Sequence, residues 1–246
     1  QLTGDAVSGL VVGARHMAAV AQLPEAVCLG RRAITNRGAA LRLEDFVDEV
    51  AAVPVPDKVD WYTKAAPSIA RVYRNNVKGC CVISGKMHNF GVWSANDSDS
   101  ANGQVVLATD AEVDQQYAGI CGPGDRGCNI QAVLDHMVRT GLNAGGVTYK
   151  LRGYCAFDWR SKELTKVAIA LGGALSIGFN LPGSWMNAAV WDTSNAGGIV
   201  GGHDVSPVGY GPPAAITTTA DGVVVSSWGR LYLMTWAAWT SSRYVD

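Results

Sequence analysis

Concentrated charge of either sign is lacking in this chain. The 246 residues carry 20 Lys and Arg against 21 Asp and Glu, a formal net charge of −1, and the basic residues are scattered along the sequence. Nucleic-acid-binding proteins show a basic stripe or patch, and proteins that bind membrane surfaces show a polybasic cluster. We therefore expect neither nucleic acid nor a membrane as a partner, but a peptide or another protein.

Long hydrophobic runs and metal-ligand motifs are lacking too. The longest apolar stretch, residues 167–181, is interrupted by Gly172-Gly173 and is too short to cross a bilayer. The six cysteines and four histidines form no Cys-x-x-Cys pair and no cluster of zinc-ligand spacing. The sequence thus argues against a metal-dependent hydrolase, and we expect no metal and no cofactor.

What is present is a composition that forms a core, with 48% hydrophobic residues. Hydrophobic periodicity predicts helices over residues 9–22, 81–94, 110–117, 130–139 and 162–171, and strands over 41–47, 147–157, 174–181, 202–208, 222–227 and 230–234. Helices come first and antiparallel strands follow. That order is typical of an α+β fold with a helical lobe, a sheet or barrel lobe and a cleft between them.

The domain boundary is expected near residue 58. Residues 1–58 are interpreted as an N-terminal helix and an extended arm with prolines at 54 and 56, and residues 59–246 as the main domain. Within the main domain, the helical lobe is expected over about 75–145 and the sheet lobe over about 146–246. The arm has two open interpretations, a pro-segment or an assembly element.

Cys81 opens the central apolar helix, and Gly202-His203 and Ser226-Ser227-Trp228-Gly229 follow far downstream. A thiol at a helix start with a later histidine is the layout of a cysteine nucleophile and its base. A helix N-terminus and a nearby imidazolium lower a thiol pKa from about 8.5 to about 3–4. We predict Cys81 as a standing thiolate and His203 as base and acid, with His88, two turns along the Cys81 face, as the less favoured imidazole.

Several motifs resemble those of the papain-like cysteine peptidase superfamily. They are Val59-Asp60-Trp61 for its V-D-W, Gly127-Cys128-Asn129 for its G-C-N, Gly209-Tyr210-Gly211 for its G-Y-G and Trp228-Gly229 for the end of its N-S-W-G, and they cover about residues 59–235. The resemblance implies a papain-like fold. It also implies that Asn75 donates a hydrogen bond to the oxyanion and that Ser226, in place of an Asn, weakly orients the histidine.

The sequence departs from the superfamily pattern near the thiol. Val82 replaces the aromatic residue that follows the nucleophile, and Lys78 replaces the cysteine that staples the active-site loop. The resemblance also implies a Cys121–Cys155 disulfide, with Cys128 lacking its usual partner. A reducing cytosol would oppose that bond, so the pairing stays open.

A second resemblance accommodates these departures. Leu43-Glu44-Asp45-Phe46-Val47 and Met234-Thr235-Trp236-Ala237 resemble segments of a divergent papain-like group, often encoded by bacteriophages and bacteria. Two functions stay open. The first is a peptidase or amide/isopeptide hydrolase acting through Cys81, His203, Asn75 and Ser226.

The second function is a virion or capsid-associated structural protein with a vestigial site, which binds other virion or self subunits through residues 1–58. A sulfur–imidazole hydrogen bond and an open groove would favour the hydrolase, and a filled cleft the structural protein. A virion, secreted or periplasmic location fits either function better than a membrane does.

Overall fold

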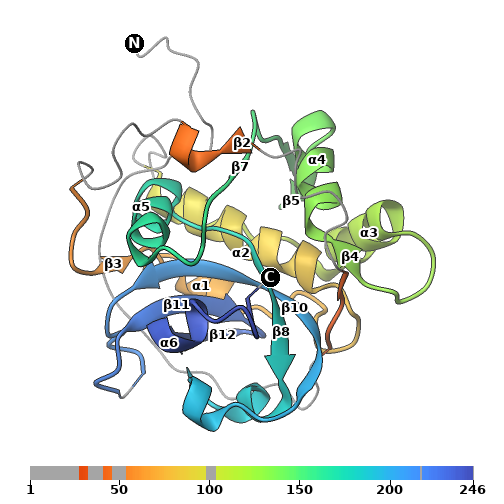
Figure 1. Ribbon diagram of the computed structural model, residues 1–246. Coiled ribbons are helices and arrows are strands. Elements are labelled where there is room, and N and C mark those ends of the chain that lie inside the picture. The colour runs from red at the N-terminus through yellow and green to blue at the C-terminus, as the bar shows by residue number, and fades with distance from the viewer. Residues whose placement is uncertain (1–27, 33–40, 46–53, 98–103, 217, 246) are drawn as a thin grey trace.

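The computed structural model describes residues 28–32, 41–45, 54–97, 104–216 and 218–245 (Figure 1). It shows the expected two-lobed α+β fold, with helices gathered on one side and a sheet on the other. The helix predicted over residues 9–22 lies outside the described residues. None of the described helices is long and apolar enough to span a bilayer.

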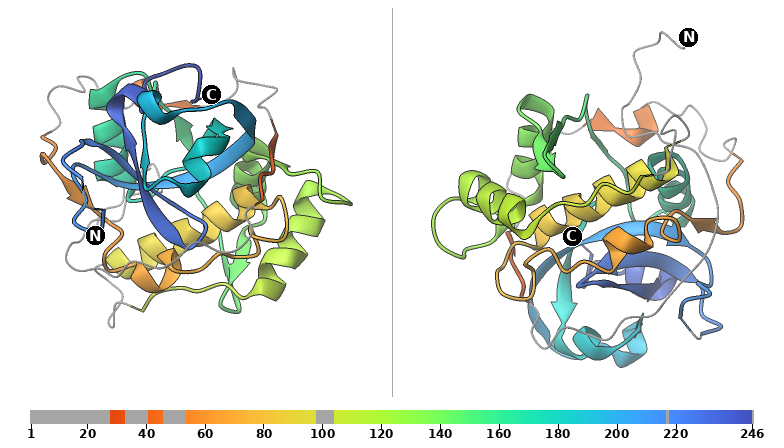
Figure 2. Two further views of the ribbon diagram at one scale, coloured as in Figure 1. Left: turned by 90° about the horizontal axis from the view of Figure 1, so that it is seen from below. Right: turned by 180° about the vertical axis from the view of Figure 1, so that it is seen from behind.

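The helical lobe is built around α2 (Cys81–Asn96), which is buried along nearly its whole length. A helix that is apolar on all faces needs partners all round it. On one side α2 contacts α3 (Asp110–Cys121) and α4 (Ile130–Arg139), and on the other it lies against the sheet (Figure 2). The helix that begins at Cys81 therefore runs between the two lobes.

The sheet lobe has a long strand at its centre, β10 (Ile199–Tyr210). The six-stranded order is β3 (Val59–Asp60), β10, β11 (Gly222–Ser227), β12 (Arg230–Thr235) and β9 (Val190–Trp191), with β8 (Ile177–Pro182) paired to the first half of β10. The pairing is antiparallel as expected, except that β9 joins β12 in parallel. Fully buried Trp185, Trp191, Trp228 and Trp239 fill this lobe.

Short elements complete the fold. They are β1 (Arg31–Arg32), β2 (Leu41–Arg42), a 3₁₀ turn (Leu43–Asp45), α1 (Ala66–Ile69), β4 (Cys128–Asn129), the hairpin β5 (Leu142–Ala144) and β6 (Val147–Tyr149), β7 (Cys155–Ala156), α5 (Lys162–Gly172), 3₁₀ turns (Gly183–Asn187 and Thr193–Asn195) and α6 (Trp236–Trp239). The helix predictions that fall on described residues agree with α2 to α5. The sequence missed the short helices α1 and α6.

Two strand predictions were wrong over part of their length. In the predicted strand 41–47, Leu41–Arg42 pair as β2, Leu43–Asp45 form the 3₁₀ helix, and residues 46–47 lie outside the described residues. The predicted strand 147–157 is interrupted after Tyr149 and resumes only as β7 at Cys155–Ala156; its first part is the second arm of a tight hairpin with β5, turned by Gly145-Gly146, both at positive φ. Alternation of apolar residues continues past the hairpin, and that pattern misled the prediction.

The structure also contradicts the Cys121–Cys155 pairing, which the resemblance implied and the sequence left open. Cys121, the last residue of α3, is bonded to Cys128 at the start of β4. Cys155 lies in β7, which pairs in parallel with β2, and its thiol is free. The bond joins the end of α3 to β4, beside the loop that precedes Cys81.

Candidate active site

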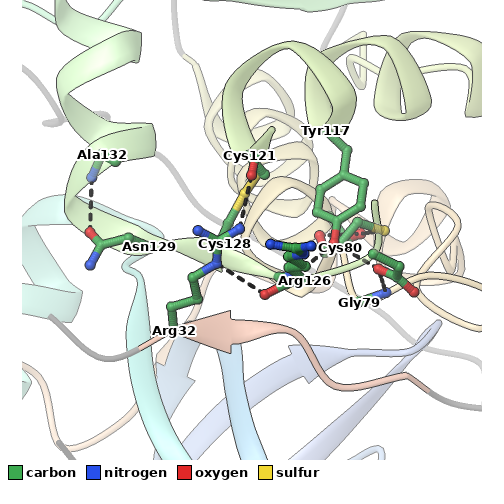
Figure 3. The surroundings of a disulfide bond; sticks show 12 residues. Arg32, Gly79, Cys80, Tyr117, Cys121, Arg126, Cys128, Asn129 and Ala132 are labelled. Atoms are coloured by element: carbon green, nitrogen blue, oxygen red, sulfur yellow. Dashed lines mark hydrogen bonds between the residues drawn. A yellow bond between two sulfur atoms is a disulfide. The ribbon is translucent and has the colours of Figure 1, made fainter. Parts of the chain in front are cut away.

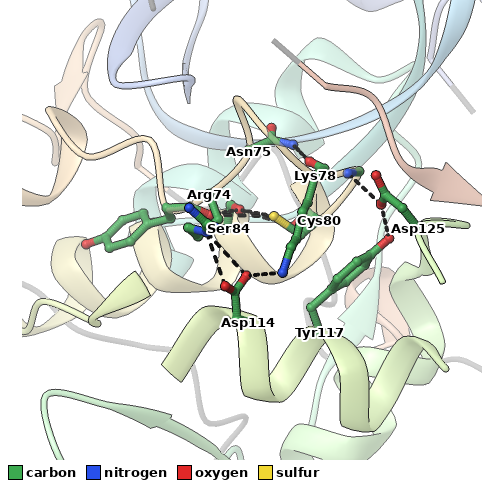
Figure 4. A network of polar contacts seen from close by, with 10 residues as sticks. Arg74, Asn75, Lys78, Cys80, Ser84, Asp114, Tyr117 and Asp125 are labelled. Carbon is green, nitrogen blue, oxygen red and sulfur yellow. Dashed lines mark hydrogen bonds and ion pairs between the residues drawn. The ribbon is translucent and has the colours of Figure 1, made fainter. Parts of the chain in front are cut away.

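The loop before Cys81 is held by ion pairs to the neighbouring helix α3. Arg74 Nε lies 3.2 Å and Lys78 Nζ 2.7 Å from the two carboxylate oxygens of Asp114 (Figure 4). These side chains are about one third exposed, so the pairs fix geometry more than they stabilise the fold. Lys78, which replaces the expected stapling cysteine, thus serves as an electrostatic staple.

Asp125 anchors the last turn of that loop from the opposite side. Its Oδ1 accepts hydrogen bonds from the Gly79 N–H at 2.8 Å and the Tyr117 hydroxyl at 2.7 Å. The Tyr117 oxygen in turn accepts from the Gly127 N–H at 2.9 Å. The backbone at Gly79 and at Gly127 is therefore fixed by one connected network.

A segment of the N-terminal arm, residues Cys28–Arg32, lies between the lobes beside Cys81, and we call it the inter-lobe segment. Its strand β1 pairs in parallel with β4, and the Cys128 N–H donates to the Gly30 carbonyl at 2.6 Å. Arg32 donates to the carbonyl oxygens of Arg126 and Cys121 at 3.0 and 2.9 Å (Figure 3). The sequence placed this arm outside the main domain and did not predict its insertion.

Asn75 contacts the inter-lobe segment through both its side chain and its backbone. Its side-chain amide donates to the Cys28 carbonyl at 2.9 Å and to the Lys78 carbonyl at 3.1 Å. The Cys28 N–H donates to the Asn75 carbonyl at 2.8 Å. The amide predicted to bind an oxyanion therefore holds a peptide carbonyl in this structure.

Cys81 is almost fully buried beneath the inter-lobe segment. Burial, with the nearby charge of Asp204 as a second cause, raises the pKa of the Cys81 thiol to about 12, although the backbone N–H groups of Asp204 and Gly30 oppose the shift. A thiol with this pKa stays protonated at neutral pH. The shift is opposite to the one expected from the helix terminus, because burial disfavours the charged thiolate.

His203 projects from β10 into the sheet lobe and is fully buried. Its Nε2 lies 2.8 Å from the Ser227 hydroxyl, and its ring stacks on Trp228 with centroids 4.1 Å apart. Burial, followed by the positive charge of Arg31, lowers the pKa of His203 to about 3. The ring is therefore neutral at pH 7 while the inter-lobe segment is in place.

The hydroxyl that contacts His203 belongs to Ser227, the residue after Ser226, which the sequence proposed for this position. The Ser226 hydroxyl is buried and makes no hydrogen bond among the described residues. Trp228, which follows at φ 48°, turns the chain sharply at the end of β11. Ser227, the last residue of β11, lies against the imidazole.

The structure does not bring Cys81 and His203 into a hydrogen bond. The His203 Nδ1 is buried and has no hydrogen-bond partner within the described part of the chain. The two residues are nonetheless linked through the backbone, since the Asp204 N–H that bonds the Cys81 sulfur immediately follows His203. Of the predicted site residues, Cys81 and Asn75 therefore contact the inter-lobe segment. His203 directly precedes Asp204, whose N–H donates to the Cys81 sulfur.

A buried ion pair beside the thiol was missed by the sequence analysis. Lys86 of α2 and Asp204 of β10 are fully buried and 3.1 Å apart, and Ser176 bonds both. Gly85 permits this approach, because a Cβ there would lie 2.6 Å from the Asp204 carboxylate. The only feature of the sequence that pointed to this ion pair was a lysine within a helix expected to be buried. The pair joins the lobes one turn from Cys81.

His88, the less favoured imidazole, lies in the helical lobe. It is buried edge-on against Tyr73 with centroids 5.0 Å apart and bonds the Ser68 backbone. Burial lowers the pKa of His88 to about 4. No cluster of potential metal ligands occurs among the described residues.

The buried thiol leads to a pH-dependent prediction. Since the pKa of Cys81 is about 12, its alkylation rate should rise by about tenfold per pH unit between pH 6 and 9, following the thiolate fraction. Iodoacetamide labelling with peptide mapping would measure the rate separately from Cys28, Cys80 and Cys155. A rate that is already constant below pH 8 would show that a thiolate exists despite the burial.

Solved structures with similar folds are cysteine proteases. Xylellain, a cysteine protease from Xylella fastidiosa, matches with TM-score 0.66 and 16% identity, over 93% of this chain and 97% of that chain. Procathepsin B S9 from Trypanosoma congolense matches with TM-score 0.58 and 14% identity, over 85% and 80% of the respective chains. Digestive procathepsin L2 proteinase from Tenebrio molitor larval midgut matches with TM-score 0.59 and 13% identity, over 89% and 77%.

No protein-family model and no curated protein matches the sequence. At these identities a structural match is a match of fold. The two-lobed architecture, with a cysteine at the start of its central helix and a histidine on its long strand, is the papain-like fold.

Proposed function

We propose that the protein is a papain-like cysteine peptidase or amide hydrolase, held closed by its own inter-lobe segment. One observation carries the proposal: an extended peptide lies against the Cys81 sulfur with its backbone bonded on both sides. The Gly30 N–H bonds the sulfur, the Gly30 carbonyl accepts from Cys128, and the Cys28 carbonyl accepts from Asn75. A site that binds its own backbone in this way suits a peptide or protein substrate.

The proposed reaction begins when the inter-lobe segment leaves. Water then reaches Cys81 and His203, so the pKa of the thiol falls and the pKa of the imidazole rises. The thiol proton can then pass to the imidazole. The thiolate attacks the substrate carbonyl carbon, and His203 gives its proton to the departing amine, which leaves an acyl-enzyme. Water then attacks the thioester while His203 accepts a proton, which releases the acid and restores the thiol.

Asn75 is assigned to the oxyanion in this reaction. Its amide already donates to a peptide carbonyl, so the direction and reach of the donor are suitable. The N–H of Cys81, at the start of α2, is the proposed second donor, since the helix has no side-chain cap at Cys80. Removing one such donor costs about 10²–10³ in turnover in hydrolases with this arrangement.

Ser227 is assigned to orient His203, because its hydroxyl lies against Nε2. Trp228 stacks on the ring and shields that hydrogen bond from water. With Nε2 held, the free Nδ1 is the nitrogen that would exchange a proton with Cys81. The assignment requires the ring or the thiol to move from its resting position, as is common between resting and reacting states.

Two observations favour a second candidate, a structural protein with a vestigial site. The Cys81 sulfur and the His203 ring share no hydrogen bond, and the space between the lobes is filled. The hydrolase is preferred because the filling is a short segment that bonds chiefly through backbone atoms. Assembly through residues 1–58 with virion or self subunits belongs to this second candidate.

The deciding experiment releases the inter-lobe segment in the intact chain. Leu29 packs against the core of the sheet lobe, so Leu29→Asp would bury a carboxylate there and should expel the segment. We expect Cys81 alkylation at pH 7 to quicken by about tenfold or more and hydrolysis of a fluorogenic peptide amide to appear. Leu41→Asp, at a leucine that is 59% exposed on the same arm, is the matched control.

Cys81→Ala in the Leu29→Asp background must abolish the hydrolysis. A released chain with fast Cys81 labelling but no turnover on a peptide library would contradict the hydrolase. Sedimentation of the intact chain and of the Leu29→Asp variant would then test for ordered assembly, the property expected of the structural candidate.

A further inference from the structure

The inter-lobe segment leaves no room for a side chain where it passes the thiol. A Cβ on Gly30 would overlap the carbonyl group of Gly79, and a Cβ on Gly127 would overlap the carbonyl of Gly30. A Cβ on Gly79 would come within 2.7 Å of the Leu29 carbonyl oxygen. Three glycines therefore meet beside Cys81, and we call this narrow passage the glycine slot.

Space, and not backbone conformation, requires glycine at position 30. Gly30 does not have the positive φ that favours glycine, whereas Gly127 has φ 72°. An alanine at position 30 could therefore adopt the same backbone conformation and would fail only because its methyl group has nowhere to go. The requirement would apply equally to any peptide that takes the place of the segment.

The walls of the glycine slot cannot readily move apart. The Gly79 N–H is bonded to Asp125, and the Gly127 N–H to the Tyr117 hydroxyl that also bonds Asp125. The disulfide between Cys121 and Cys128 closes the loop that carries Gly127. A methyl group in a space fixed on both sides meets the steric cost of an overpacked core.

The next position along the segment fits arginine. Arg31 lies over Gly178 of β8 and Gly202 of β10, where a Cβ on Gly178 would come 2.5 Å from its Cδ. Its Nη2 donates to the Asn180 side-chain oxygen at 3.2 Å. The charge of Arg31 also acts favourably on the buried carboxyl of Asp204.

Leu29 and Arg32, which flank Gly30 and Arg31, also have specific contacts. Leu29 lies against Gly201, where a Cβ would meet its Cδ1 at 2.9 Å, and packs on the sheet-lobe core. Arg32 turns to the helical lobe and donates to two backbone carbonyl oxygens. Along the segment, Leu29 therefore meets apolar surface and Gly30 occupies the slot. Arg31 meets the Asn180 side-chain oxygen, and Arg32 meets two backbone carbonyl oxygens.

We infer that the site selects peptides with glycine beside Cys81, preceded by an apolar residue and followed by basic residues, as in Leu29-Gly30-Arg31-Arg32. The inference rests on the proposed function, since it names the peptides that the same site would take. The inter-lobe segment is then a copy of the preferred ligand. A residue other than glycine at the slot is rejected by Gly79 and Gly127. The first arginine is favoured by the Asn180 oxygen and the charge of Asp204, and the second by two backbone carbonyl oxygens.

The first experiment uses the full chain with Gly30→Ala. The added methyl group should displace the inter-lobe segment and raise the Cys81 alkylation rate at pH 7 by about tenfold or more, the scale of effect expected of one methyl group in a fixed space. Gly153→Ala is the matched control, because a Cβ at Gly153 meets nothing within 4 Å. An unchanged Cys81 alkylation rate in Gly30→Ala would contradict the proposal that the slot admits only glycine.

The second experiment measures protection of Cys81 by acetylated peptides in the Gly30→Ala chain. Ala-Leu-Gly-Arg-Arg should slow alkylation by about tenfold or more relative to Ala-Leu-Ala-Arg-Arg, and Ala-Leu-Gly-Gln-Gln should protect less than the first peptide. Equal protection by the glycine and alanine peptides would overturn the inference. Should Gly30→Ala fold poorly, Leu29→Asp offers the same test in a chain with an unaltered slot.

Protection needs no turnover, so the inference and the proposed function fail separately. Protection by the glycine peptide without cleavage would support the glycine slot and contradict the hydrolase. Cleavage of glycine and alanine peptides at equal rates would support the hydrolase and overturn the glycine slot.

Discussion

Replacing Lys86 by methionine is expected to lower the free energy of unfolding by about 3–5 kcal/mol, the cost of breaking a buried ion pair by removing one partner. Methionine fills a similar volume, so the loss comes from electrostatics. It leaves the Asp204 carboxyl buried with a hydrogen bond from Ser176 and the favourable charge of Arg31. Urea unfolding of the intact chain would measure the change.

The size of this loss should depend on pH. Burial raises the pKa of Asp204 and Lys86 opposes that shift, so in Lys86→Met the folded-state pKa should rise further above the unfolded value. A raised folded-state pKa contributes stability at low pH that disappears as the pH increases through it. The loss caused by Lys86→Met should therefore be smallest in acid and grow toward neutral pH.

A double variant separates charge from packing. Adding Asp204→Asn to Lys86→Met removes the uncompensated charge and should recover most of the lost free energy. A loss in Lys86→Met below about 1 kcal/mol at neutral pH, with no pH dependence, would mean that the pair contributes no more than an exposed one.

Local patterns predicted those parts of the fold that depend on neighbouring residues. The run from Cys81 to Asn96 is helical and buried because its apolar and small residues continue round the helix. The α4 helix was predicted at its observed bounds, Ile130–Arg139, since Asn129 caps its start and its apolar face is narrow and regular. These features lie within single turns, where sequence periodicity is informative.

The inter-lobe segment could not be predicted in this way. Its position depends on backbone pairing between β1 and β4, which are far apart in sequence, and on the absence of side chains at Gly30, Gly79 and Gly127. Nothing in five residues of an arm shows which distant glycines will face them. The expected pKa of Cys81 was wrong for a related reason: the sequence argument assumed water at the helix terminus, whereas the thiol is buried.

The two adjacent serines show a different limit. Position in a motif aligned Ser226 with the orienting asparagine, and successive side chains of a strand point to opposite faces. Which of the two meets His203 depends on how β11 pairs with β10 and β12, and the Ser227 side chain lies on that face. Pairing between distant strands could not be read from a local motif. The motif indicated the region, and the choice of Ser227 over Ser226 belongs to the proposed function.

His203→Ala, introduced into the Leu29→Asp chain, should lower peptide-amide turnover by about 10²–10⁴-fold, since it removes the proposed acid and base. Ser227→Ala should cost about tenfold or more, because the ring loses the hydroxyl that fixes Nε2. Ser226→Ala is the matched control: its hydroxyl has no partner among the described residues, so turnover should stay near the parent value.

The pH profile separates orientation from a general loss of structure. If Ser227 only orients the imidazole, Ser227→Ala should reduce turnover across the profile without changing its shape. The stability of Ser227→Ala should fall by about 1–3 kcal/mol relative to Ser226→Ala, because only the Ser227 hydroxyl has a buried hydrogen-bond partner. Equal losses from the two serine changes would place the orienting contact elsewhere. A larger loss from Ser226→Ala would restore the assignment made from sequence.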